Sequence, residues 1–129
     1  MNFRKLDVWE RAHMLAQSVY SLTDEHPGLV RYGLASQMQH AGADIASNIA
    51  RGCGSSGNDG AQRWYFNAAM GSAASLEYLV LLTFELGLIP DDEQEWFTTM
   101  AVDVQKMLGA MLDEEAVEER ASASLAIVQ

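Results

Sequence analysis

Apolar residues recur every three or four positions along four stretches of the chain, and this spacing predicts four helices. The predicted helices cover about residues 6–25, 33–51, 61–86 and from about 90 onward. Pro27-Gly28 ends the first stretch, and Gly87 with Leu88 ends the third. Because short connections place consecutive helices side by side, we expect an all-α fold, an antiparallel up-down-up-down four-helix bundle.

Glycines mark the connection that follows the second predicted helix. They are frequent over residues 52–60, so we expect that helix to end near residue 51 and a flexible loop to follow it. Asn58 or Asp59 is the expected N-cap of the third helix.

The bundle is expected to occupy residues 1–115 as one domain. The remaining residues, 116–129, are first acidic, then rich in alanine and serine, and finally apolar. They form either a C-terminal tail or an extension of the fourth helix. We expect this segment to be held in place, either by continuing that helix or by docking on a neighbouring subunit.

The apolar stripes also predict which face of each helix turns inward. The stripe of the first helix consists of Leu6, Trp9, His13, Ala16 and Tyr20, with Val19 beside them. The stripe of the third helix consists of Phe66, Ala69, Met70, Ala73, Leu76, Val80, Thr83, and Leu86 or its neighbours.

The second helix carries the most informative pattern in the chain. Six of its positions, separated by four and three residues in alternation, form a heptad-like seam that indicates an assembly or core motif. The seam consists of Leu34, Met38, Ala41, Ile45, Asn48 and Gly52. Small residues occupy much of the remaining helix surface, so another backbone can approach it closely. Asn48 either fixes register and partner number or hydrogen-bonds the backbone of the next helix.

Charge is distributed unevenly along the chain, whose net charge is −10. Residues 1–63 hold six basic and six acidic residues, whereas residues 64–129 hold two basic and twelve acidic residues. We interpret the acids chiefly as a solvated surface, and they would repel nucleic acid unless a basic patch lies apart from them. The lone Cys53, the lack of a signal segment and the short apolar runs favour a cytoplasmic setting and no membrane partner.

No set of residues predicts catalysis or cofactor binding. The glycines over residues 52–57 lack the ending and the preceding strand of a phosphate loop. Cys53 follows a helix C-terminus, where the dipole disfavours a thiolate. The histidines show no metal-ligand spacing, and His40 with Asp44 favours an ion pair over a weak two-ligand site. We therefore expect no enzyme activity, no catalytic residue, no cofactor and no metal site.

Several short motifs occur in an order that is typical of one bacterial family. They are Phe3-Arg4-Lys5-Leu6-Asp7-Val8-Trp9-Glu10-Arg11-Ala12, Val19-Tyr20, His26-Pro27, Tyr32-Gly33-Leu34 through Gln37, Asn48-Ile49-Ala50 with Gly52, Gly71-Ser72 with Leu76-Glu77, and Leu86-Gly87-Leu88-Ile89. Through them the chain, from about Phe3 to Leu112, resembles the intervening-sequence proteins of bacterial 23S ribosomal RNA genes, also called S23 ribosomal or four-helix-bundle proteins. The resemblance implies a homopentamer of antiparallel four-helix bundles without enzyme activity. Related accessory proteins of diversity-generating retroelements form basic barrels that bind nucleic acid and a reverse transcriptase.

The chain departs from this family's pattern at positions that bear on function. Gln39-His40 stands where the family has a basic pair, and Arg51 where it has an acid. Ser75 replaces a common glutamate and Leu79 a polar residue. The loss of the basic pair weakens the implied nucleic-acid binding. The changes to Ser75 and Leu79 make the third helix more apolar, which is compatible with a tighter subunit contact.

These observations lead to two main hypotheses and a weaker third. In the first, the chain is a non-enzymatic, self-assembling adaptor or scaffold, homopentameric by resemblance, whose second and third helices supply the packing surfaces. In the alternative, it is a nucleic-acid-binding accessory protein of an rRNA intervening sequence or a reverse transcriptase, and a ring of subunits clusters its basic residues. The residues proposed for that contact are Arg4, Lys5, Arg11, Arg31, Arg51 and Arg63. In the third, the acidic C-terminal helix binds a basic protein.

Overall fold

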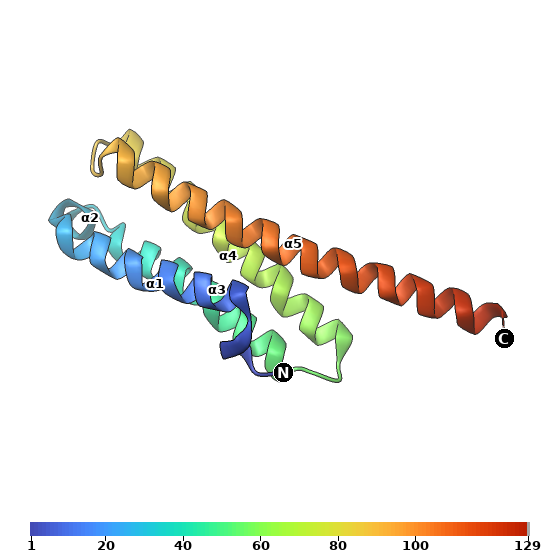
Figure 1. The fold of residues 1–129 in the computed structure, drawn as a ribbon. Coiled ribbons are helices and arrows are strands. Elements are labelled where there is room, and N and C mark those ends of the chain that lie inside the picture. The colour runs from blue at the N-terminus through green and yellow to red at the C-terminus, as the bar shows by residue number, and fades with distance from the viewer. Residues whose placement is uncertain (129) are drawn as a thin grey trace.

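The computed structural model describes the backbone of residues 1–128, with side chains over 1–114, at 118 and over 120–125. Helices are the only regular elements in this described part, which confirms the expected all-α class (Figure 1). They are η1 (Phe3–Lys5), α1 (Asp7–Glu25), α2 (Pro27–Arg31), α3 (Ala35–Gly54), α4 (Asp59–Glu85) and α5 (Asp91–Val128). Over the described residues, no helix combines the length and the apolar character that crossing a membrane requires.

The four long helices, α1, α3, α4 and α5, pack as a bundle around one apolar core. α3 lies between α1 and α4, and α5 packs against α4 and, less extensively, against α1. α1 and α4 are therefore diagonal to each other. Figure 1 shows α5 continuing past the ends of the other helices, so its last turns stand outside the bundle.

The buried face of α1 differs from the expected stripe. The α1 side chains that are at most 3% exposed are Val8, Ala12, Leu15, Val19 and Leu22. Trp9 is only partly buried, while His13 and Tyr20 are exposed. Ala16 and Val19 are buried as predicted. The prediction was wrong for His13 and Tyr20 because it followed the rings, and the rings of Phe3, Trp9 and His13 pack on one another at the edge of the core. The Trp9 ring stacks on that of His13, with 4.8 Å between their centroids, and meets that of Phe3 edge-on.

The stripe predicted for α4 agrees with the structure except at Leu86, which is the C-cap of the helix and is 56% exposed. Its buried members are Phe66, Ala69, Ala73, Leu76, Val80 and Thr83, and Met70 is partly buried. The buried hydroxyl of Thr83 donates a hydrogen bond of 2.9 Å to the backbone oxygen of Val80. This contact satisfies the one polar side chain that α4 places in the core.

α3 continues to Gly54 instead of ending near residue 51. Gly52 and Cys53 are buried helical residues, because packing against α4 overrides the usual tendency of glycine to end a helix. The connection to α4 is reduced to residues 55–58. Asn58 is the N-cap of α4, since its Oδ1 accepts a hydrogen bond of 3.1 Å from the backbone N–H of Ala61.

Two further features shape the ends of the helices. Gly87 has a φ of 76°, and its N–H and that of Leu88 bond the oxygens of Phe84 and Thr83, as a glycine-terminated helix requires. The expected stop at this position is therefore confirmed. Pro27 does more than end α1: it occupies the first turn of the short helix α2, which the sequence pattern did not predict.

Candidate assembly surface

The seam of α3 lies inside the chain's own core. Leu34, Met38, Ala41, Ile45, Asn48 and Gly52 are all buried. Their side chains are covered within the chain's own bundle and are out of reach of a second subunit. Asn48 Oδ1 accepts a hydrogen bond of 3.4 Å from Nη1 of Arg51 on the same helix. Any contact with a second subunit would therefore use other residues.

The outer face of α4 carries an exposed surface without charged side chains, which we call the α4 ridge. Its exposed residues follow helical spacing and are Trp64, Asn67, Gly71, Ala74, Ser75, Tyr78 and Leu81. Trp64 is 66% exposed, Tyr78 59% and Leu81 42%. None of the seven residues is charged, and the middle of the ridge is made of small residues. A second backbone can approach such a helix face closely.

Hollows lie on both sides of the ridge. One, of about 420 Å³, lies between α3 and α4, and its lining includes His40, Ser75 and Tyr78. The other, of about 380 Å³, lies between α4 and α5, and Tyr78 and Leu81 help to line it. Tyr78 therefore projects between two hollows. A partner with a complementary shape could fill the hollows and contact the Tyr78 side chain.

A second surface with apolar side chains lies between α1 and α5, where the bundle is less closely packed. A hollow of about 750 Å³ is lined there by Met14, Met100 and Met107, and polar and charged residues complete the lining: Asp7, Glu10, Arg11, His13 and Gln17. Met14 is 42% exposed. Methionine side chains adapt readily to the shape of a partner. Because α1 is diagonal to α4, this hollow and the α4 ridge face different sides of the bundle.

Four of the six candidate nucleic-acid residues come together at one end of the bundle. Arg4 and Lys5 lie in η1, which packs on α3. Arg51 lies in the last turn of α3, and Arg63 lies near the start of α4. The fold thus produces a basic end that residue spacing alone does not show.

The other two candidates lie apart from this end. Arg31 is the last residue of α2, at the opposite end of the bundle. Arg11 Nη1 is 3.7 Å from Oδ2 of Asp103 on α5, so its charge is already paired.

The acidic part of α5 lies near the basic end. Glu114 and Glu118 line a hollow together with Met1, Asp59 and Gln62, which belong to that end of the chain. Residues 113–119 contain five acids. Their negative charge lowers the electrostatic attraction that this end can exert on a phosphate backbone.

Cys53 is placed as an inert thiol. Its side chain is 1% exposed, and its Sγ lies 3.8 Å from Sδ of Met1. Burial raises the pKa of the Cys53 thiol above its ordinary value, while the positive N-terminus acts in the opposite direction. Because the thiolate is the reactive form, this environment does not support a nucleophile.

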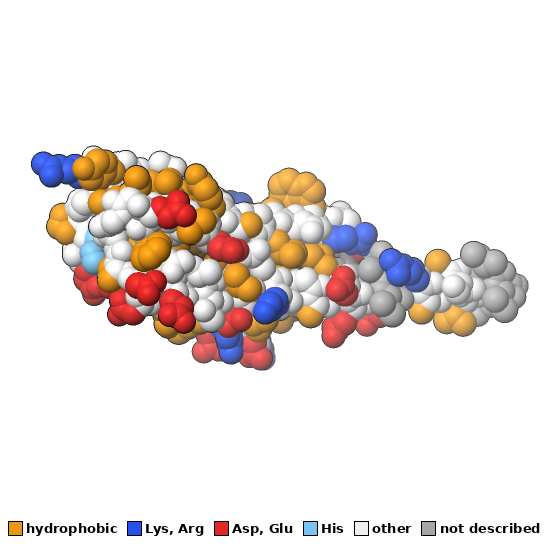
Figure 2. Space-filling model, turned by 90° about the horizontal axis from the view of Figure 1, so that it is seen from above, with side chains coloured by type: hydrophobic (Ala, Val, Ile, Leu, Met, Phe, Trp, Pro, Cys, Tyr) orange, Lys and Arg blue, Asp and Glu red, His pale blue; other side chains and the backbone are white. Residues whose placement is uncertain are grey.

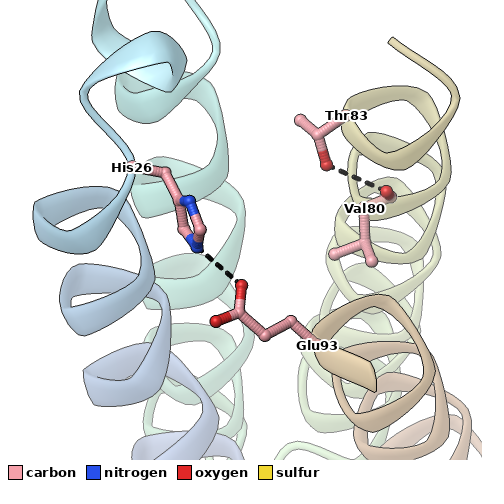
Figure 3. Close-up of polar contacts among 4 residues, drawn as sticks. All are labelled: His26, Val80, Thr83 and Glu93. Carbon is pink, nitrogen blue, oxygen red and sulfur yellow. Dashed lines mark hydrogen bonds and ion pairs between the residues drawn. The ribbon is translucent and has the colours of Figure 1, made fainter. Parts of the chain in front are cut away.

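Two histidines contact carboxylates, and only one of these contacts could be predicted from residue spacing. His40 Nε2 lies 3.2 Å from Oδ2 of Asp44, which is one turn further along the same exposed helix face. His26 Nε2 lies 2.7 Å from Oε2 of Glu93 (Figure 3). A carboxylate oxygen of Glu25 lies within 4.8 Å of both ligand atoms. The sequence carries no local signal for the contact between His26 and Glu93, because the two residues are 67 positions apart and only the fold brings them together.

The fold defines a helical-bundle protein, and the α4 ridge forms an exposed uncharged strip along one of its helices. The chain belongs to the family of 23S rRNA-intervening sequence proteins, whose pattern matches residues 4–110. It is similar to a protein of unknown function from the S23 ribosomal protein family of Bacteroides thetaiotaomicron, with a TM-score of 0.74 and 18% sequence identity. That similarity covers 82% of this chain and 95% of the other, and at this identity it concerns the fold alone. No curated protein matches the chain. The family predicted from the ordered motifs is thus confirmed.

Proposed function

We propose that this chain is a non-catalytic subunit that assembles with copies of itself and serves as a scaffold or adaptor. The α4 ridge is the observation that carries the proposal. Trp64 and Tyr78 remain 66% and 59% exposed in the isolated chain. Burial of such side chains in a subunit contact makes the free energy of association more favourable by roughly 25 cal/mol for each Å² of apolar surface removed from water.

The composition of the ridge supports a contact between helices. Gly71, Ala74 and Ser75 let a second backbone come close, while Trp64 and Tyr78 provide larger side chains that can fill pockets. No charged group on the ridge has to be desolvated when it is covered. Aromatic residues in a surface poor in charge are typical of the centre of a protein interface.

A ring is the form of assembly that the two surfaces favour. Head-to-tail contacts use two different surfaces on each subunit and form a closed ring when the rotation between subunits permits it. The α4 ridge and the methionine-lined hollow between α1 and α5 are two such surfaces. Five copies is the number that the family resemblance implies.

We also infer an antiparallel up-down-up-down course for the four long helices. The connections over residues 55–58 and 86–90 are too short to carry the chain back along the bundle. In this topology the basic ends of all subunits would lie on one side of a ring.

A charge placed on the ridge tests the proposed contact. We expect Tyr78→Glu to raise the dissociation constant of the assembly at least about 30-fold, which corresponds to roughly 2 kcal/mol for a central interface residue. Sedimentation velocity over a range of protein concentrations measures the change. Because Tyr78 is 59% exposed in the single chain, the substitution should leave the helical content unchanged.

Tyr20→Glu is the matched control for this experiment. Tyr20 is 52% exposed on α1, away from the α4 ridge and outside the lining of the methionine hollow. We expect the Tyr20→Glu variant to assemble with the same dissociation constant as the wild type. Equal effects of the two substitutions, or none from Tyr78→Glu, would contradict the placement of the contact on α4.

Nucleic-acid binding is the second candidate function, because Arg4, Lys5, Arg51 and Arg63 share one end of the bundle. Replacement of Arg4 and Lys5 together by alanine should reduce the slope of log K against log salt by roughly one for each residue. Fluorescence anisotropy of a labelled RNA oligonucleotide, between about 50 and 200 mM salt, measures this slope. An unchanged slope, or no binding at the lowest salt, would remove this candidate.

A further inference from the structure

His26 lies at the corner between α1 and α2, where the backbone leaves helical geometry. It is the C-cap of α1 and the N-cap of α2, with a φ of −123° and a ψ of 84°. Its backbone N–H donates a hydrogen bond of 3.2 Å to the backbone oxygen of Leu22. Its backbone oxygen accepts a hydrogen bond of 2.9 Å from the backbone N–H of Leu29. The backbone is therefore fixed on both sides, and Figure 3 shows the imidazole pointing toward the carboxylate of Glu93 on α5.

Two carboxylates converge on this imidazole. Glu25 precedes His26 at the end of α1, and Glu93 lies in the first turn of α5. One ligand atom from each of the three residues lies within 4.8 Å of the others, and Nε2 of His26 is 2.7 Å from Oε2 of Glu93. The side chains of His26 and Glu93 are only 24% and 26% exposed, so they are partly withdrawn from bulk water.

We propose that Glu25, His26 and Glu93 bind a divalent cation, and that the donor set favours Zn²⁺. One imidazole nitrogen and two carboxylate oxygens are ordinary Zn²⁺ ligands. Mg²⁺ and Ca²⁺ prefer oxygen donors throughout, so the imidazole selects against them. This site is independent of the assembly surface, which uses other residues.

The contact between His26 and Glu93 is close to the spacing of two ligands of one ion, and the oxygen of Glu25 lies within 4.8 Å of both. Ligands at about 2.0–2.2 Å from a tetrahedral Zn²⁺ are roughly 3.3 Å from one another. The contact between His26 and Glu93 needs to open by about half an ångström to admit the ion, which a small side-chain rotation can supply. Glu25 is exposed and can adjust its own side chain in the same way.

The surroundings add charge and open coordination positions. Glu25 and Glu93 line a hollow of about 390 Å³, to which Asp92 adds a further carboxylate. In the described part of the chain, no lysine or arginine forms an ion pair with Glu25 or Glu93. Figure 2 likewise shows a histidine beside acidic side chains at one end of the molecule. A cation here relieves the repulsion between carboxylates, and water from the hollow can complete its coordination.

Calorimetric titration of the full, tag-free chain with Zn²⁺ in a non-chelating buffer tests the proposal. We expect saturable binding of one ion per chain. Glu25→Gln should weaken it by roughly tenfold or more, since even the loss of an outer partner of a metal ligand costs about 10–100-fold. His26→Ala should have at least the same effect. Because Glu25 is exposed, its variant remains informative if His26→Ala fails to fold.

His40→Ala provides the matched control, because His40 forms the other histidine–carboxylate contact but has a single carboxylate partner, Asp44. We expect it to leave the affinity and the stoichiometry unchanged. The proposal is overturned if the wild type shows no saturable binding, or if Glu25→Gln and His26→Ala bind as the wild type does. A loss of binding in His40→Ala alone would also overturn it.

Discussion

Replacement of Leu76 by alanine is expected to lower the free energy of unfolding by about 2–5 kcal/mol, which is the cost of a buried leucine-to-alanine change. Leu76 lies on the inner face of α4 and is 0% exposed, so the substitution leaves a cavity between packed helices. Urea denaturation followed by circular dichroism measures the loss. Because the cavity lies within one chain, the loss should be the same at every protein concentration.

Leu81→Ala is the matched substitution on the outer face of the same helix. Leu81 is 42% exposed and belongs to the α4 ridge. The single chain should lose no more than about 0.5 kcal/mol from this change. If the ridge is a subunit contact, assembly stabilises the folded wild type by mass action, more strongly at higher protein concentration. Any loss of unfolding free energy beyond about 0.5 kcal/mol in Leu81→Ala should therefore increase with protein concentration. A loss for Leu81→Ala that equals that of Leu76→Ala and does not depend on concentration would contradict the assignment of the two faces.

Gly52→Ala is expected to lower the free energy of unfolding by about 1–3 kcal/mol, as overfilling of a packed core does. An added Cβ would lie 2.5 Å from Cε1 and 2.7 Å from Cδ1 of the Phe66 ring. Phe66 is 2% exposed and has little room to withdraw. The gain in helix propensity from glycine to alanine, up to about 1 kcal/mol, is too small to compensate.

Gly54→Ala separates this steric effect from the change in propensity. Gly54 ends the same helix, is exposed, and has nothing within 4 Å of an added Cβ. Its φ is not positive, so alanine fits without strain. We expect it to be neutral or to stabilise the chain by up to about 1 kcal/mol. Thermal unfolding of both variants is the measurement, and equal midpoints would refute the close packing of α3 against Phe66.

Most of the helices could be predicted from the sequence, because their core-facing residues keep the helical period. The errors arose where tertiary contacts outweighed local signals. Gly52 begins a glycine-rich segment of the kind that usually ends a helix. α3 nevertheless continues to Gly54, because Gly52 is packed against Phe66. On α1, the aromatic residues suggested a stripe that included Trp9 and Tyr20, whereas the core is filled by Leu15 and its aliphatic neighbours.

The surfaces were harder to predict than the core. α4 is apolar on more than one side, so the periodicity of its sequence does not distinguish the face that holds Leu76 from the face that holds Tyr78. The sequence indicated that this helix was unusually apolar, but only the fold shows which residues remain uncovered. The contact between His26 and Glu93 depends on two segments 67 residues apart, and local spacing carries no signal for it.

Light scattering of the wild-type chain, coupled to size-exclusion chromatography at micromolar concentration, tests self-assembly most directly. We expect a particle whose mass is a whole multiple of 14.2 kDa, and the family resemblance makes five the expected multiple. The mass should fall when Tyr78→Glu is measured under the same conditions. A wild-type chain that remains a single species of 14.2 kDa at every concentration would contradict self-assembly through the α4 ridge.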